Sequence, residues 1–162
     1  MDKSEQVIAG FWDIFNKRIF LDGYKMKSQL KGYKPSELHF MQHVLSHTDS
    51  NVTKLADAFY MTRSAISKLA QKLLQKGLIK SYQKPDNRKE IYFTLTKEGL
   101  EVSRVHEALH REAKARDQAV FDQVSDAQYA DMLKFIGHYN KHLDREIEKL
   151  GAKRTAGYYD RL

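Results

Sequence analysis

One stretch of the chain, residues 51–95, most constrains what the sequence can fold into. It reads NVTKLADAFYMTRSAISKLAQKLLQKGLIKSYQKPDNRKEIYFTL. Apolar residues recur at three- and four-residue steps in its first part, which predicts a short helix, a tight turn and a second helix over 63–76. Thr62 is a favourable N-cap for this second helix, and Gly77 is a favourable residue to end it. The pattern therefore predicts two helices joined by a short connection.

Two strand-like runs follow this helix pair. Residues 79–83 and 90–96 contain β-branched and aromatic side chains, and the basic, turn-forming segment 84–89 separates them. Two helices followed by a hairpin form a winged helix-turn-helix, which places its second helix in the major groove of DNA. We therefore expect a recognition helix over 63–76 and a wing over 79–96.

Positive charge is concentrated in the same part of the chain. Residues 51–90 contain nine Lys and Arg against three Asp and Glu, a net charge of +6, whereas all 162 residues together carry +7. A sequence pI of about 9.4 indicates a polyanionic partner, either nucleic acid or an anionic membrane surface. Membrane binding would need a basic helix with a broad exposed apolar face. The basic helix is expected to bury that face, so double-stranded DNA is the expected partner and a membrane is not.

The composition excludes several other classes of protein. The sequence contains no cysteine, which excludes thiol redox sensing, cysteine zinc sites and disulfides. The first twenty residues contain no apolar run long enough for a signal peptide or a membrane span. We therefore expect a soluble, cytoplasmic protein.

Amphipathic helices are predicted on both sides of the basic stretch. The expected fold class is mainly α with a small β-wing (α+β), a winged helix-turn-helix with N- and C-terminal dimerisation helices. A loop is expected after Gly23, a helix opening at Pro35, and a break at 97–99. We expect one domain over residues 1–150, a tail over 151–162, and within the domain the following parts: a DNA-binding lobe at 32–98 and helical dimerisation segments at 4–22 and 100–149.

These elements, in this order, resemble the MarR family of bacterial transcriptional regulators over residues 7–148. The helix-turn-helix and the strand that runs into IYFTLTKEG carry the resemblance, and the ending Leu95-Thr96-x-x-Gly99 is particularly similar. The resemblance implies a homodimer, joined through its terminal helices, on a palindromic operator. It also implies a repressor, and many repressors of this family release DNA when a small molecule binds between the dimer core and the DNA-binding lobes.

The predicted wing differs from the family pattern at one position. Family wings often carry Asp-Arg-Arg at the tip, whereas this chain has Asn87-Arg88-Lys89. Asn87 cannot form the ion pair with Arg that often orients the wing of these regulators. We expect Arg88 or Lys89 to enter the minor groove, where a cation responds to groove width.

Candidate DNA contacts fall into three groups. Arg63, Ser64 and Ser67, near the start of the recognition helix, are placed to read base edges, and Arg can bind guanine through two hydrogen bonds. A second group, of polar and basic residues, is assigned to phosphates, and a third group forms the wing. The predicted set is Asn51, Thr53, Lys54, Thr62, Arg63, Ser64, Ser67, Lys68, Lys72, Lys84, Asn87, Arg88 and Lys89.

Histidines recur at four-residue steps, which places them on one helix face. His106-Glu107-Ala108-Leu109-His110 matches the zinc-protease pattern H-E-x-x-H, but its flanks are charged and no further histidine follows at the extended spacing. We therefore expect no enzyme and no catalytic residues.

Three histidines also allow a zinc-responsive repressor as an alternative function. His39, His106 and His110 are placed like the zinc ligands of zinc-uptake repressors in the resembling family, with Asp22 as the only counterpart of their carboxylate. Tetrahedral zinc needs a fourth ligand. The same histidines could instead form a hydrogen-bonded junction between helices. Zinc is thus a candidate cofactor, and no cofactor is firmly expected.

The sequence therefore predicts a sequence-specific DNA-binding regulator, a dimeric repressor tuned by a small effector. A non-specific architectural DNA-binding protein is a further alternative, because it would share the charge without reading bases. Several aromatic residues could line an effector cavity, although each of them also suits a core position. They are Trp12, Phe15, Tyr24, Phe40 and Tyr60.

Overall fold

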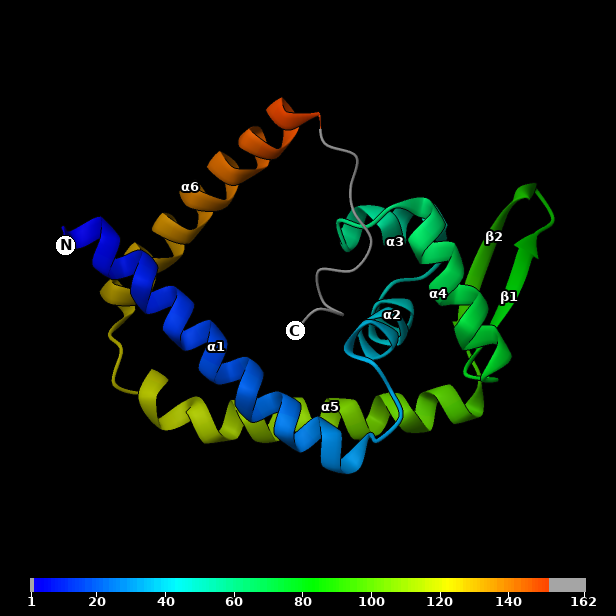
Figure 1. Ribbon diagram of the computed structural model, residues 1–162, viewed down its shortest axis with the longest axis horizontal. Helices are drawn as coiled ribbons and strands as arrows, with labels where there is room; N and C mark the ends of the chain where they lie inside the picture. The colour runs from blue at the N-terminus through cyan, green and yellow to red at the C-terminus, as the bar shows by residue number, and fades with distance from the viewer. Residues whose placement is uncertain (1, 152–162) are drawn as a thin grey trace.

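The computed structural model describes residues 2–151 of the chain (Figure 1). The elements follow in the order α1 (Lys3–Gln29), α2 (Pro35–Ser46), α3 (Val52–Ala58), α4 (Arg63–Gln75), β1 (Ile79–Lys84), β2 (Asn87–Leu95), α5 (Lys97–Phe121) and α6 (Asp126–Leu150). The expected fold class, mainly helical with a two-stranded wing, is confirmed. The predicted tail, apart from Gly151, lies outside the described residues.

The long helix α5 is the support on which the other elements are arranged. At its N-terminal end lie α2, α3, α4 and the hairpin, α1 lies along its middle, and α6 leads away from its C-terminal end (Figure 1). Buried apolar residues from α2, α3, α4 and both strands form one core, with Phe40, Met41, Leu55, Ile66 and Leu73 at its centre. This core holds the helix-turn-helix and the hairpin together as one lobe.

Side-chain caps fix the starts of the two helices of the helix-turn-helix. The Oγ1 atom of Thr62 accepts a hydrogen bond from the Ala65 backbone N–H at 3.1 Å, as its place in the sequence predicts. The Oδ1 atom of Asn51 accepts from the Lys54 N–H at 2.9 Å and caps α3. These caps set the point at which each helix begins and therefore which side chains face outward.

Two predicted boundaries were wrong. The first helix continues to Gln29 instead of ending at 22, because it passes through Gly23 and packs Met26 against the core. The segment 97–99 is the first turn of α5, not a break, because Thr96 caps this helix. Gly99 is needed there for close packing, since a Cβ at this position would lie 2.0 Å from the Leu78 carbonyl oxygen.

The hairpin is also tighter than predicted. Its antiparallel register pairs Ile79 with Leu95 and Tyr82 with Tyr92, but Lys84 then pairs with Asn87. The turn is therefore Pro85-Asp86 instead of 84–89. The partners of Tyr82 and Lys84 are Tyr92 and Asn87, so residues 88–91 form a bulge on β2 opposite Gln83.

A buried carboxylate fastens α4 to α2. The Glu37 side chain is fully buried and lies 3.0 Å from the Lys72 Nζ atom and 2.9 Å from the Lys76 Nζ atom. Its Oε2 atom also accepts the Lys34 backbone N–H at 2.9 Å. Burial alone would raise the pKa of Glu37, but the Lys34 N–H and the two ammonium groups together lower it below its ordinary value.

Polar side chains are also buried where α5 packs against α2. His106 and Ser103 are almost fully buried, and the His106 Nε2 atom lies 3.1 Å from the His110 Nε2 atom. The rings of His39 and His106 are 5.9 Å apart between centroids. Burial, with the nearby His110 and His39, lowers the pKa of His106 to about 4. His106 is therefore neutral at physiological pH.

We predict that Glu37→Gln lowers the free energy of unfolding at pH 7 by about 1.5–3 kcal/mol, the usual contribution of hydrogen bonds to a charged group. The measurement is urea unfolding at fixed protein concentration. Glu107→Gln is the matched control, because Glu107 is exposed and, within residues 2–151, pairs only with Arg111 on its own helix. Equal, small effects of both changes would contradict the role assigned to Glu37.

We predict that acid destabilises the fold partly through His106. Its pKa is about 4 when folded and about 6.5 when unfolded, so the unfolded chain binds the extra proton between these pH values. Stability should fall there by up to about 1.4 kcal/mol per pH unit for this group as pH decreases. Unfolding of His106→Gln at several pH values should show a shallower decline, and the exposed His138→Gln should match the wild type.

Candidate nucleic-acid interface

The N-terminal half of α4 presents a polar face to solvent. Ile66, Ala70 and Leu73 are buried on the opposite side of the helix, so the helical period turns Arg63, Ser64 and Ser67 outward. All three are exposed, as is Lys68 one residue further on. Within residues 2–151, no side-chain hydrogen bond or ion pair occupies any of these four residues. This face is therefore available to a ligand.

The residues predicted to bind phosphates have more varied surroundings. Lys72 is held by Glu37, and the Nζ atom of Lys54 donates to the Asp49 carbonyl oxygen at 3.1 Å. Asn51 is buried, and its Nδ2 atom donates to Glu90 Oε2 at 3.0 Å while its Oδ1 atom caps α3. The structure thus gives Asn51 and Lys72 roles within the fold.

The cations of the wing differ in their exposure and in their side-chain partners. Arg88 and Lys89 lie on the bulge of β2, are exposed, and have no side-chain partner among the described residues. Lys84 is instead held by Asp49, with the Nζ and Oδ2 atoms 2.6 Å apart. Asn87 accepts the Lys89 backbone N–H at 3.3 Å and donates to the Tyr92 hydroxyl at 3.4 Å. The amide of Asn87 therefore stabilises the turn side of the bulge.

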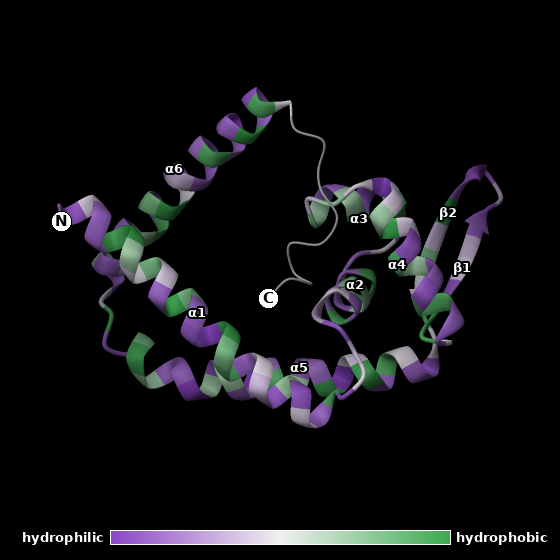
Figure 2. Cartoon of the chain, in the orientation of Figure 1, coloured by the Kyte–Doolittle hydropathy of each residue, from purple (hydrophilic) through white to green (hydrophobic). Residues whose placement is uncertain are grey.

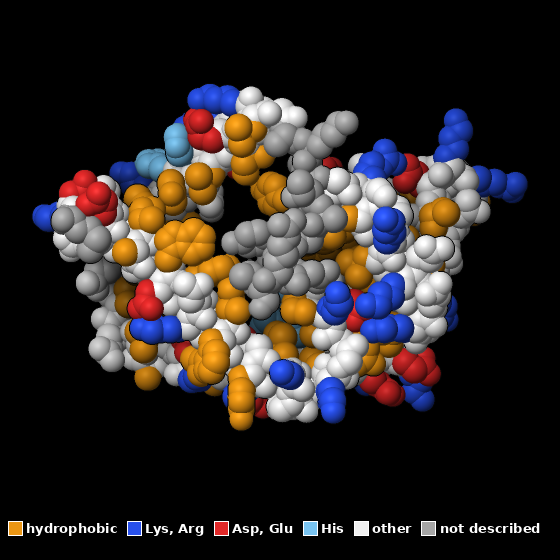
Figure 3. Space-filling view, viewed as in Figure 1, with side chains coloured by type: hydrophobic (Ala, Val, Ile, Leu, Met, Phe, Trp, Pro, Cys, Tyr) orange, Lys and Arg blue, Asp and Glu red, His pale blue; other side chains and the backbone are white. Residues whose placement is uncertain are grey.

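These elements give the lobe one positively charged side. Lys and Arg side chains gather over α4 and the tip of the hairpin in the space-filling view (Figure 3). The two features needed for groove binding, an outward recognition helix and a cationic hairpin tip, lie in the same lobe of the molecule (Figure 1). Chemically, the surface can bind phosphates and present a guanidinium to base edges.

Two acidic residues near this surface were not singled out from the sequence. Asp49 lies in a cluster, Thr48-Asp49-Ser50-Asn51, that indicates a turn, and its backbone is left-handed with φ of 56°. Glu37 follows Pro35 in a position that suits the start of a helix. A local signal therefore accounted for each of these residues. It gave no sign that Asp49 binds Lys84, or that Glu37 binds Lys72 and Lys76.

A cavity of about 420 Å³ lies between α1, α2 and α5. Apolar side chains form much of its wall, with Arg18, Asp22, His39 and His110 as the polar or charged members. Of the aromatic residues that the sequence suggested for a cavity, Phe15 lines this one, whereas Phe40 is in the core. Its residues are Phe15, Arg18, Ile19, Asp22, Gly23, Met26, Pro35, His39 and His110.

Of the predicted zinc ligands, His39 and His110 line this cavity, and His106 lies against both of them. Across residues 2–151, no group of three or more His, Cys, Asp or Glu side chains could hold a metal ion. Asp22, the expected carboxylate, lies 3.6 Å from Arg116 in an ion pair. The His106 Nδ1 atom is buried and has no hydrogen-bond partner in the described part of the chain. The arrangement fits the alternative of a polar junction between helices better than it fits zinc.

The helices outside the lobe leave large apolar faces uncovered. Neither α1 nor α6 has a buried residue, although apolar and polar residues alternate along both (Figure 2). The rings of Phe11 and Phe135 approach to 6.3 Å between centroids. Exposed hydrophobic side chains on these helices include Trp12, Phe15, Phe20, Leu133, Ile136, Leu143 and Ile147. Such extended apolar faces are typical of an interaction surface.

Among the described residues, no helix has the length and apolar character that crossing a membrane requires.

Comparisons with known proteins agree with this geometry. A sequence profile of the MarR family matches residues 34–91. The chain is 24% identical to the HTH-type transcriptional regulator PchR of Bacillus subtilis over 90% of this chain and 92% of the relative. It is 30% identical to the uncharacterized HTH-type transcriptional regulator YvnA of the same organism over 70% of this chain and 72% of the relative.

Solved structures with the same fold include one in complex with DNA and one in complex with small molecules. Streptococcus pneumoniae FabT in complex with DNA superposes with a TM-score of 0.75 at 20% identity, covering 88% of this chain and 99% of FabT. Staphylococcus aureus MarR in complex with salicylate and kanamycin superposes with a TM-score of 0.68 at 17% identity, covering 88% of this chain and 93% of the other. The chain belongs to the MarR family of winged helix-turn-helix transcriptional regulators.

Proposed function

We propose that the chain is a dimeric repressor that binds a palindromic DNA operator through α4 and the wing and is tuned by a small effector. The observation that carries this proposal is the polar face on the N-terminal half of α4. Its side chains have no partner among the described residues, and the exposed Arg88 and Lys89 of the hairpin are equally unpaired there. A recognition helix in the major groove, with a cation in the adjacent minor groove, uses both features.

The division of labour on the DNA follows from these surroundings. Arg63, Ser64 and Ser67 read base edges, because they are exposed near the N-terminus of α4 and Thr62 fixes where that helix starts. Lys54, Lys68 and Thr53 bind phosphates near the two helix starts. Lys72 and Asn51 contribute indirectly by holding α4 and α3 in place.

The apolar faces of α1 and α6 support a homodimer. Association would bury side chains that one chain leaves largely exposed, such as Leu133 at 66% and Trp12 at 55%. A dimer presents two α4 helices related by a two-fold axis, and a palindromic operator has the same symmetry. We propose one domain over residues 1–150 with its lobe and dimerisation segments combined in this way.

The cavity between α1, α2 and α5 supports an effector site. It lies where the proposed dimerisation helix α1 meets α2 of the DNA-binding lobe, so an occupant would contact both parts. Its volume lies within the range of small-molecule sites, and its apolar wall with Arg18 suits an apolar molecule that carries an anionic group. The similar S. aureus MarR is bound to salicylate, a ligand of this chemical class.

We predict that Arg63→Met weakens binding to an operator obtained by in vitro selection about tenfold or more, because a pair of hydrogen bonds to guanine contributes about 1–3 kcal/mol. Binding to random DNA should change little. Fluorescence anisotropy over a range of salt concentrations measures both. Lys68→Met should weaken binding to both DNAs and lower the log–log salt slope by about 0.9 for each phosphate that is no longer neutralised.

The control for these variants is Lys134→Met, which removes an exposed charge from α6, far from α4 in the fold (Figure 1). It should leave both affinities unchanged. Equal weakening on operator and random DNA for Arg63→Met would favour the architectural alternative, and a wild-type protein that never prefers a selected sequence would reject the proposal.

We predict that Leu133→Lys weakens the dimer at least tenfold. Leu133 is 66% exposed in one chain, so a charge there is tolerated by the isolated subunit and opposed only where a second subunit covers it. Sedimentation velocity over a concentration series measures the dissociation constant. Ile91→Lys, an equally drastic change at a 50% exposed apolar residue of the wing, should leave it unchanged. A monomeric wild type would contradict the proposed dimer.

A further inference from the structure

The connection between α2 and α3 acts as a support for the wing. The Phe93 backbone N–H donates to the Ser50 carbonyl oxygen at 3.0 Å, and Asn51 forms an isolated antiparallel bridge with Tyr92. Residues 50 and 51 therefore extend the two-stranded hairpin on one edge. An isolated hairpin is only marginally stable in water, so its orientation depends on such contacts with the rest of the lobe.

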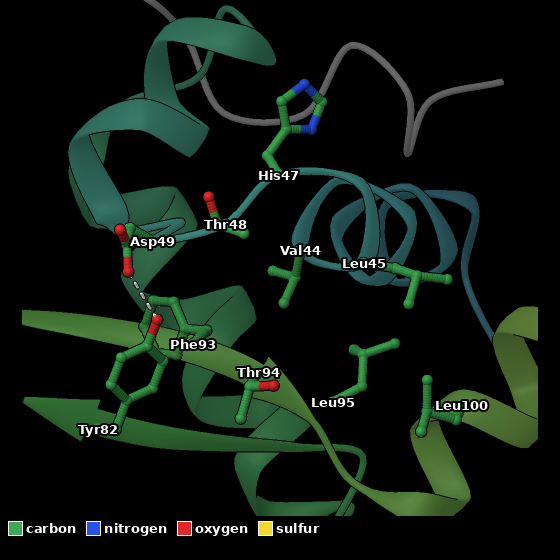
Figure 4. A pocket seen from close by; sticks show the side chains of 10 residues that line it. All are labelled: Val44, Leu45, His47, Thr48, Asp49, Tyr82, Phe93, Thr94, Leu95 and Leu100. Carbon is green, nitrogen blue, oxygen red and sulfur yellow. Dashed lines mark hydrogen bonds between the residues drawn. The ribbon is translucent and has the colours of Figure 1, made fainter.

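Asp49 adds side-chain bonds to β1 within this support. Its Oδ2 atom lies 2.6 Å from the Lys84 Nζ atom, and its Oδ1 atom accepts the Tyr82 hydroxyl at 3.0 Å. Figure 4 shows the Asp49 carboxylate meeting the Tyr82 hydroxyl at one end of a pocket between α2 and the hairpin. Lys84 also lies over the ring of Tyr92 on β2, 5.1 Å from its centroid. One carboxylate thus reaches the last part of β1, next to the turn at the tip.

A second carboxylate crosses the same junction in the other direction. Glu90, on the bulge of β2, accepts the Asn51 amide at 3.0 Å. Asp49, outside the wing, therefore binds residues of the wing, and Glu90, in the wing, binds a residue outside it. Gln83 closes the bulge by donating to the Arg88 carbonyl oxygen at 2.8 Å. With both ties in place, the side chains of Arg88 and Lys89 are left facing solvent.

We propose that Asp49 is a positioning residue that orients the wing for DNA, and that Lys84 is its anchor instead of a DNA contact. This inference rests on the proposed DNA-binding function. Asn87, at the tip of the wing, has no charge with which to orient the wing. The proposal assigns that orienting role to the α2–α3 connection. It also revises the predicted DNA contact at Lys84 and leaves Arg88 and Lys89 as the cations that reach the minor groove.

Electrostatics alone and a positioning role for Asp49 predict opposite changes in DNA affinity when the charge of Asp49 is removed. Hydrogen bonds from Lys84 and Tyr82 lower the pKa of Asp49, and the bond to Asp49 raises the pKa of Lys84, so both groups are charged at neutral pH. A negative charge beside a DNA-binding surface repels phosphates. If Asp49 had no positioning role, removing its charge would therefore strengthen DNA binding; if it orients the wing, removal weakens binding.

The test compares Asp49→Asn, Lys84→Met and the double variant in operator binding over a range of salt concentrations. Asn tolerates the left-handed backbone at this position, so the change removes the charge and preserves the turn. We expect each single variant to bind about tenfold more weakly, the double variant to bind no more weakly than either, and all three to keep the wild-type salt slope.

Asp86→Asn is the matched control, because it removes the same charge from the exposed turn of the wing, where Asp86 has no side-chain partner among residues 2–151. We expect this variant to bind DNA as tightly as the wild type or more tightly. Tighter binding by Asp49→Asn as well, with a salt slope lowered by about 0.9 per protomer for Lys84→Met, would overturn the proposal and make Lys84 a phosphate contact. Additive weakening in the double variant would overturn it too.

Hydrogen–deuterium exchange of the DNA-free protein separates this proposal from the proposed function. In Asp49→Asn, the amides of residues 86–91 should exchange faster, whereas those of α1 and α6 should match the wild type. Unchanged exchange in the wing would reject the positioning role. A wild-type protein that fails to prefer any operator would reject the DNA-binding proposal, and the exchange result would still decide whether Asp49 holds the wing.

Discussion

The carboxylate of Glu37 is enclosed between α2 and α4, and the placement of the recognition helix depends on it. A buried charge is tolerated only with partners, and Glu37 has three: the ammonium groups of Lys72 and Lys76 and the Lys34 backbone N–H. Lys72 lies in the C-terminal half of α4, and Lys76 directly follows the helix. The C-terminal half of α4 is therefore fixed to the rest of the lobe. The N-terminal half, with Arg63 and Ser67, then projects outward at a defined angle.

The lobe uses the same principle a second time at the wing. There, Asp49 binds Lys84 and Tyr82, and Glu90 binds Asn51. In each case basic or polar residues that look available for DNA in the sequence are bound by a carboxylate from another element. Fewer cations are therefore unpaired than the composition suggests, and among the described residues they include Arg63 and Lys68 on α4 and Arg88 and Lys89 on the bulge of β2.

Much of the lobe could be predicted because its signals are local. The periodicity of 63–76, the cap at Thr62 and the alternation of the strands all arise from neighbours within a few residues. Predictions were wrong where a distant contact decided the outcome. Met26 carries α1 past Gly23 into contact with the core, and the close approach of Leu78 requires Gly99 at a point that otherwise reads as a break. For the histidines, spacing placed His106 and His110 on one face, but the ion pair of Asp22 with Arg116 depends on packing.

The sequence by itself determined the class of the protein, because helix period, strand alternation, capping residues and the clustering of charge are properties of short segments. It also determined which side of α4 faces solvent, since the apolar positions define the buried side. Only the tertiary structure decided which charges remain free. Ion pairs such as Glu37 with Lys72, or Asp49 with Lys84, join residues more than thirty positions apart in the chain, and no local pattern specifies which carboxylate meets which ammonium group.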